Sequence, residues 1–98
     1  MNKEIEVLAK RELEEANKIH PQFSSTHEGY AVILEETEEL AEESEEIEKL
    51  IRTWWAYLRK DEDIGIQKRR VKKIRIHAVN AVKEAIQVIA MCDKFNNL

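Results

Sequence analysis

The sequence has few residues that break helices. Its 98 residues include only two glycines and one proline, whereas folds rich in strands and tight turns need more of both. The chain is also too short for two domains of ordinary size. We therefore expect one all-α domain over residues 1–98.

Cysteine and long apolar runs are equally scarce. The lone Cys92 excludes an internal disulfide, and no His and Cys residues have the spacing of a structural zinc site. A chain without disulfides is typical of a reducing compartment, so we expect a cytoplasmic protein. The first residues lack the apolar core of a signal peptide, and the uncharged run 85–92 is too short to cross a bilayer. The sequence predicts no membrane association.

Charge is unevenly distributed along the chain. The net charge is −4, but the two halves differ in sign. Residues 1–50 contain 5 Lys or Arg and 15 Asp or Glu, whereas residues 51–98 contain 11 Lys or Arg and 5 Asp or Glu. Oppositely charged halves of one small protein are expected to attract each other.

Apolar residues at spacings of three and four predict three helices. The first covers residues 3–20 and ends before Pro21, and Ser25 with Glu28 forms a capping box for the second. The second helix carries a long stripe up to its end at residue 58, and a breaker segment at 60–65 separates it from a third helix at 66–95. The stripe of the second helix comprises Ile33, Thr37, Leu40, Ser44, Ile47, Ile51, Trp54 and Leu58. The apolar face of the third comprises Val71, Ile74, Ala78, Ala81, Val82, Ala85, Val88, Ile89 and Cys92.

The second helix is long for so small a protein. Some 33 residues extend roughly 50 Å, which is more than the remaining chain can cover. Short connections favour antiparallel neighbours. We therefore expect long antiparallel helices in a bundle that is completed by oligomerisation, as a homodimer or a homotetramer.

Glutamates on the second helix are the densest chemical signal. Glu36 and Glu39 border the apolar stripe, so both can face a groove between helices, whereas Glu35 and Glu38 point further away. Two carboxylates one turn apart can hold a hard cation such as Mg²⁺.

A polar ridge on the third helix strengthens this signal. Its members lie at alternating spacings of four and three along one flank of the apolar face. They are Lys73, His77, Asn80, Glu84, Gln87 and Met91. If the two helices pack antiparallel, Glu36 and Glu39 face Glu84 and Gln87 across one cleft.

Two segments resemble a known family. FSSTHEGYAVILEETEEL at residues 23–40 and KEAIQVIAM at 83–91 are similar to MazG-like proteins of phages and prophages, in the all-α nucleoside triphosphate pyrophosphohydrolase superfamily. The resemblance covers residues 22–95. It implies a helical bundle completed by oligomerisation, and hydrolysis of (d)NTP to (d)NMP and pyrophosphate with Mg²⁺, or Mn²⁺ in its place, as cofactor.

The resemblance also implies roles for single residues. Glu36, Glu39 and Glu84 match metal ligands, and Glu35, together with Glu36, matches the catalytic carboxylates of the first motif. Gln87 takes the position where relatives usually have an aspartate and is the fourth candidate metal ligand. It can coordinate the cation through a neutral oxygen but adds no charge, which predicts weaker cation binding and reduced activity. Lys73 and Arg70 are candidate phosphate partners, and His77 and Asn80 candidate substrate contacts.

Other interpretations of these features differ in function. The basic run 68–75 could attract triphosphate or nucleic acid, but it lacks an aromatic residue for base stacking, and we expect it chiefly to neutralise the acidic half. Trp54 and Leu58 belong to the apolar stripe and indicate a core or a subunit interface. The rival to an enzyme is a non-catalytic helical oligomeric interaction protein whose functional surface is this stripe.

Overall fold

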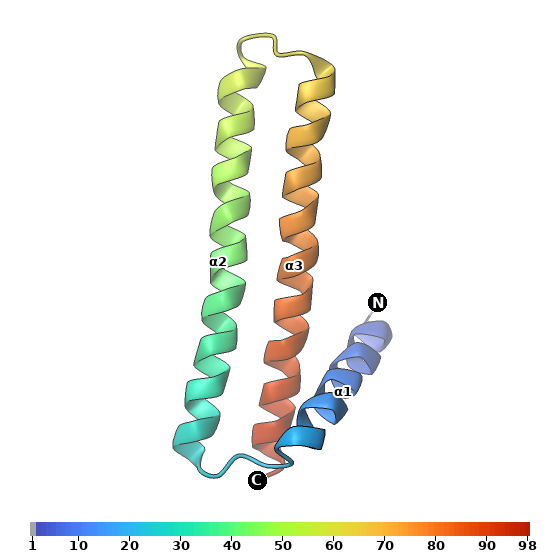
Figure 1. Cartoon of the computed structure of the whole chain (residues 1–98), viewed down its shortest axis with the longest axis vertical. Helices are drawn as coiled ribbons and strands as arrows, with labels where there is room; N and C mark the ends of the chain where they lie inside the picture. The colour runs from blue at the N-terminus through green and yellow to red at the C-terminus, as the bar shows by residue number, and fades with distance from the viewer. Residues whose placement is uncertain (1) are drawn as a thin grey trace.

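The computed structural model describes residues 2–98, and within this range the chain forms three helices. They are α1 (Asn2–Ile19), α2 (Thr26–Leu58) and α3 (Ile64–Asn96). The helices α2 and α3 form a long antiparallel hairpin, and α1 packs against the C-terminal part of α3 on the side away from α2 (Figure 1). The molecule measures 56 × 26 × 21 Å. The expected all-α fold is confirmed.

Local side chains set the helix ends. Ser25 accepts a hydrogen bond from the Glu28 backbone N–H at 3.1 Å, as the capping box predicts. The Glu28 carboxylate, however, accepts from the backbone N–H and the hydroxyl of Ser24 instead of from Ser25. At the start of α3, Asp63 accepts from Gly65 and Ile66 N–H groups, so α3 begins two residues earlier than the breaker segment predicts.

Interactions across the hairpin turn hold its two helices in register. Arg70 donates two hydrogen bonds to Glu62, at 2.7 and 2.9 Å, and its guanidinium lies 4.1 Å from the centre of the Tyr57 ring. The Trp54 indole N–H donates to Gln67 at 3.2 Å. The turn itself includes Asp61 at φ 53°, a left-handed conformation that Asp tolerates.

The core is concentrated where all three helices meet. Phe23, Ala90 and Met91 are buried there, and five partly buried side chains pack against them. The ammonium of Lys94 is buried in the same region, where it donates to the His20 carbonyl at 2.6 Å. No large side chain among residues 2–98 is fully buried, because the distal half of the hairpin is only two helices wide.

The predicted apolar stripes are only partly internal, which corrects the sequence analysis. On α2, Ser44, Ile51 and Leu58 are exposed, while Glu36, Glu43 and Leu50 are half-buried in their place. On α3, the exposed members of the predicted face are Val71, Ala78, Val82 and Cys92. The physical reason is helix rotation: one neighbouring helix covers only a narrow seam, and on much of α2 that seam runs one position earlier than the predicted stripe.

None of the described helices is both long enough and apolar enough to cross a membrane.

Candidate metal centre

Two helices bring three carboxylates together. Glu36 and Glu39 lie one turn apart on α2, and Glu84 lies opposite them on α3. Each offers a carboxylate oxygen that lies within 4.8 Å of the others, and all three side chains are half-buried. The hairpin register produces this meeting, since the nearby Glu43 and His77 are also paired across it, at 2.7 Å. We call Glu36, Glu39 and Glu84 the glutamate triad.

Gln87 joins the triad through its amide. The orientation that satisfies its surroundings directs the side-chain nitrogen to Glu36 at 2.8 Å and to Glu84 at 3.0 Å. In this arrangement Gln87 donates hydrogen bonds to two acceptors, whereas an aspartate at the same position would add a fourth negative charge. The amide must therefore rotate before its oxygen can face a cation.

The triad is electrostatically crowded. Burial raises the pKa of Glu36 above its ordinary value, and the charges of Glu39, Glu84, Glu35 and the α1 residue Glu12 raise it further. The pKa of Glu84 is raised as well, most strongly by burial. The hydrogen bond and the charge interaction with Glu39 raise it further, as does the charge of Glu43. Three oxygens drawn from converging carboxylates suit a hard cation, which relieves this repulsion. The cluster could hold a metal ion.

This crowding predicts the effect of pH on stability. A carboxyl whose folded pKa is raised favours the folded state below its unfolded pKa of about 4.5, and that advantage is lost as the pH rises through the folded pKa. We therefore expect Glu84→Gln to raise the melting temperature of metal-free protein by a few degrees at pH 7.5, and to change it little at pH 4. Thermal unfolding by circular dichroism in EDTA measures both values.

The matched control for this prediction is Glu38→Gln. Glu38 is exposed on the same helix as Glu36 and Glu39 and lies outside the triad. Its replacement is expected to leave the melting temperature nearly unchanged at both pH values. A stabilisation by Glu84→Gln that persists at pH 4 would contradict the electrostatic explanation.

The remaining predicted residues lie at different distances from the triad. Glu35 is exposed on α2 beside Glu36. Asn80 and His77 are half-buried on α3, about 6 and 10 Å from Glu84 along the helix axis. Lys73 is exposed in a separate cavity of about 260 Å³ near the hairpin turn. Arg70 lies about 21 Å from Glu84 along the axis and is occupied by Glu62. The structure thus brings the glutamate triad and Gln87 together. The two predicted phosphate partners, Lys73 and Arg70, lie elsewhere.

Sequence reasoning missed three features of this region. Glu43 lies one turn beyond Glu39 on α2 and contacts His77, and its heptad spacing from Glu36 could have identified it. Glu12 and a cavity of about 380 Å³ come from the packing of α1, which no spacing in the sequence predicts. The cavity is lined by Leu8, Arg11, Glu12, Val79, Val82, Lys83, Ile86 and Gln87.

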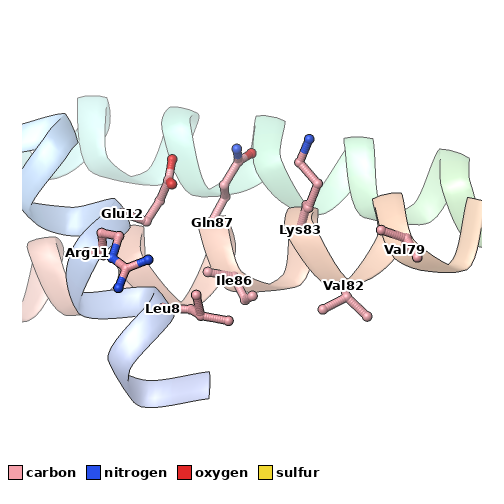
Figure 2. A pocket seen from close by; sticks show the side chains of 8 residues that line it. All are labelled: Leu8, Arg11, Glu12, Val79, Val82, Lys83, Ile86 and Gln87. Atoms are coloured by element: carbon pink, nitrogen blue, oxygen red, sulfur yellow. The ribbon is translucent and has the colours of Figure 1, made fainter. Parts of the chain in front are cut away.

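The cavity adjoins the triad through a shared residue. Gln87 lines it and also hydrogen-bonds to Glu36 and Glu84. Figure 2 shows Glu12, Gln87 and Lys83 extending to one side of α3, while Leu8, Ile86 and Val82 lie together on the other. The cavity therefore has an apolar part and a polar rim, as small-molecule sites commonly do.

Comparison with known proteins gives no relative for this chain: no family model, curated protein or solved structure matches it.

Proposed function

We propose that the protein is a Mg²⁺-dependent nucleotide pyrophosphohydrolase of the MazG-like type, which converts (d)NTP to (d)NMP and pyrophosphate. The observation that carries the proposal is the triad. Glu36 and Glu39 come from one of the two segments that resemble this family, Glu84 comes from the other, and their oxygens converge within 4.8 Å. Nothing in the fold requires three glutamates to meet, and their mutual repulsion opposes folding.

In this proposal each residue near the triad has a distinct task. Glu36, Glu39 and Glu84 hold Mg²⁺, or Mn²⁺ in its place, and Gln87 fixes the positions of Glu36 and Glu84. The bound ion supplies positive charge that neutralises the triphosphate and favours attack by water. Glu35 accepts a proton from the attacking water. The oxygen of that water bonds to the α-phosphorus while the bond from this phosphorus to the pyrophosphate leaving group breaks.

The rest of the nucleotide has a suitable place beside the triad. The 380 Å³ cavity offers apolar side chains for a base or sugar, and Arg11 and Lys83 at its rim carry charges opposite to those of phosphate. His77 and Asn80 lie on the same helix, about two turns and one turn from Glu84. Lys73 and Arg70, proposed from the sequence as phosphate partners, lie further away, so we assign the nearer phosphate contacts to Lys83 and Arg11.

Pyrophosphate release tests the proposal directly. Purified protein is incubated with each common NTP and dNTP and Mg²⁺, and pyrophosphate is measured by a coupled assay. We expect release that depends on Mg²⁺ and disappears in the Glu36→Ala/Glu39→Ala variant. Equal release by wild type and variant for every nucleotide would overturn the enzyme proposal.

A second candidate function is a non-catalytic interaction protein, which the exposed aromatic residues favour. Trp55 is 59% exposed and Tyr30 68% exposed, whereas Trp54 is half-buried and hydrogen-bonded within the chain. Calorimetry separates the candidates. Absence of Mg²⁺ or Mn²⁺ binding with and without nucleotide, together with loss of a complex in Trp55→Ala, would favour the interaction protein.

A further inference from the structure

The end of the hairpin around its turn is strongly basic. Residues 49–75 contain ten Lys or Arg and three Asp or Glu, a net +7, whereas the rest of the chain contains six Lys or Arg and 17 Asp or Glu, a net −11. The helix α1 packs against the other end of α3 and leaves this part of the hairpin uncovered (Figure 1). We call residues 49–75 the basic end. Such a concentration of positive charge on an exposed surface is typical of a site for a polyanion.

Few cations of the basic end are paired within the chain. Among residues 2–98, Arg70 is the only one of the ten that forms an ion pair, and its partner Glu62 belongs to the turn itself. The neutralisation of the acidic half that the sequence predicts for the run 68–75 therefore does not take the form of ion pairs. The other cations of this run are all exposed, and their charges are available to a ligand. They are Lys68, Arg69, Lys72, Lys73 and Arg75.

Three of the cations surround one cavity near the turn. The cavity has a volume of about 260 Å³ and is lined by Leu50 of α2 and by Ile66, Arg69, Arg70 and Lys73 of α3. Arg69 and Lys73 lie four residues apart on one face of α3, about 6 Å along the helix axis. The described lining of this cavity contains no carboxylate. Neighbouring cations on one face, without an acidic neighbour in the lining, suit the phosphates of a nucleic-acid backbone.

An aromatic ring adjoins this cavity, whereas the basic run by itself has none. Tyr57 of α2 is 44% exposed. The guanidinium of Arg70, which lines the cavity, lies 4.1 Å from the centre of the Tyr57 ring, and the Lys60 ammonium lies 5.8 Å from it. Two hydrogen bonds to Glu62 hold the guanidinium in this position. Aromatic rings and arginine planes beside a basic surface are the groups on which unpaired bases stack.

The extent of the basic end favours a strand over a single nucleotide. The exposed cations of α3 continue past the cavity from Lys68 to Arg75, roughly 10 Å along the axis. A second aromatic residue of the basic end, Trp55, is 59% exposed and has the guanidinium of Arg59 5.9 Å from its ring centre. Bases in a duplex are stacked on one another, so their faces cannot reach such rings, whereas the bases of a single strand can.

We propose that the basic end binds single-stranded nucleic acid, with backbone phosphates at Arg69 and Lys73 and an unpaired base on the stack of Tyr57 and Arg70. Lys73 lies about 16 Å from Glu84 along the axis of α3, so this site is separate from the glutamate triad. The proposal does not depend on nucleotide hydrolysis.

Fluorescence anisotropy tests the proposal. The probes are a labelled oligothymidylate and a labelled oligouridylate, each about 20 nucleotides long to exceed a usual site size. We expect wild type to bind both at low salt, with an affinity that falls as salt rises. Arg69→Gln/Lys73→Gln is expected to weaken binding about tenfold, and to lower the slope of log affinity against log salt by about 1.4, at about 0.7 for each lost phosphate contact.

The matched control is Lys3→Gln/Lys10→Gln. It removes the same charge from two exposed residues of α1, far from the basic end, and we expect binding within about twofold of wild type because distant exposed charges are screened. Glu36→Ala/Glu39→Ala is expected to bind the strands as wild type does. Loss of hydrolysis and loss of strand binding are therefore distinguishable.

Tyr57→Leu tests the stacking contact. The substitution keeps an apolar side chain beside Arg70 and removes the ring, so we expect about tenfold weaker binding of both strands. The salt slope is expected to stay the same, since no phosphate contact is lost. The helical circular dichroism, expected to match wild type, shows that the fold is retained.

Three results would contradict the proposal. No change in anisotropy with either strand up to about 100 µM protein, the weak end of non-specific binding, would overturn it. Equal weakening by Arg69→Gln/Lys73→Gln and by Lys3→Gln/Lys10→Gln would overturn the site. Tighter binding to a duplex of the same length, or binding to phosphatidylserine vesicles without binding to the strands, would overturn the choice of partner.

Discussion

Replacing Glu39 by Gln is expected to lower pyrophosphate release by about 100-fold or more at saturating nucleotide. The substitution keeps the size of the side chain, replaces one acceptor oxygen by an N–H donor, and removes one of three negative charges that could hold the cation. A catalytic metal contributes several kcal/mol to phosphoryl-transfer barriers, and about 1.4 kcal/mol corresponds to a factor of ten in rate. Initial rates at several Mg²⁺ concentrations, with calorimetric titration of Mg²⁺, measure the effect.

Glu38→Gln is the matched control for this loss. Glu38 neighbours Glu39 in sequence, is exposed, and belongs to the same acidic helix, so its replacement reduces the overall negative charge equally. We expect its rate to stay within about twofold of wild type, since an exposed charge at that distance is screened by solvent. Equal losses in both variants would indicate a general effect of charge and would contradict a specific role for Glu39.

Replacing Gly29 by Leu is expected to destabilise the fold by about 3 kcal/mol, at the upper end of the usual cost of overpacking. Gly29 is buried on α2. A Cβ atom added there would lie 2.6 Å from one ring carbon of Phe95 and 3.2 Å from one of Phe23. Both rings belong to or pack against the buried cluster where the three helices meet. Thermal or urea unfolding by circular dichroism measures the loss, expected as roughly 10 °C or more in melting temperature.

Ala31→Leu is the control for Gly29→Leu. Ala31 lies two residues further along α2 and is exposed, so a larger side chain has room in solvent, and Leu is a good helix former. We expect a melting temperature near that of wild type. If Gly29→Leu were as stable as Ala31→Leu, the close packing of α2 against Phe95 and Phe23 would be refuted.

Local rules predicted the helices well because their causes are local. Pro21 ends the first helix pattern, Ser25 caps the second, and a cluster of polar residues near Asp63 separates the second from the third. Glu84, Gln87 and Met91 are three and four residues apart, which predicted that they share one flank of α3. In the hairpin, this flank lies beside Glu36. The predicted meeting of these residues follows from two helical periods and an antiparallel connection.

Local rules could not separate the buried part of each apolar face from its exposed part. Periodicity indicates that Ile47 and Ile51 both belong to an apolar face, but Ile47 is half-buried and Ile51 is 49% exposed. Which of two adjacent stripes faces the neighbouring helix depends on the rotation of each helix, and that rotation is set by contacts along the whole hairpin. The same reason explains why Cys92, expected in the core, is exposed.

The sequence by itself determined the helical class, the helix ends and the candidate carboxylates, since each depends on residues within a few positions of one another. Only the tertiary structure decided how closely these carboxylates approach one another and which other charges surround them. It gave Glu36, Glu39 and Glu84 a common centre and added the charge of Glu12 from α1. It also placed Arg70 with Glu62, away from that centre. These are contacts between segments far apart in the chain, and their free energy depends on the register and rotation of packed helices, which no short sequence pattern specifies.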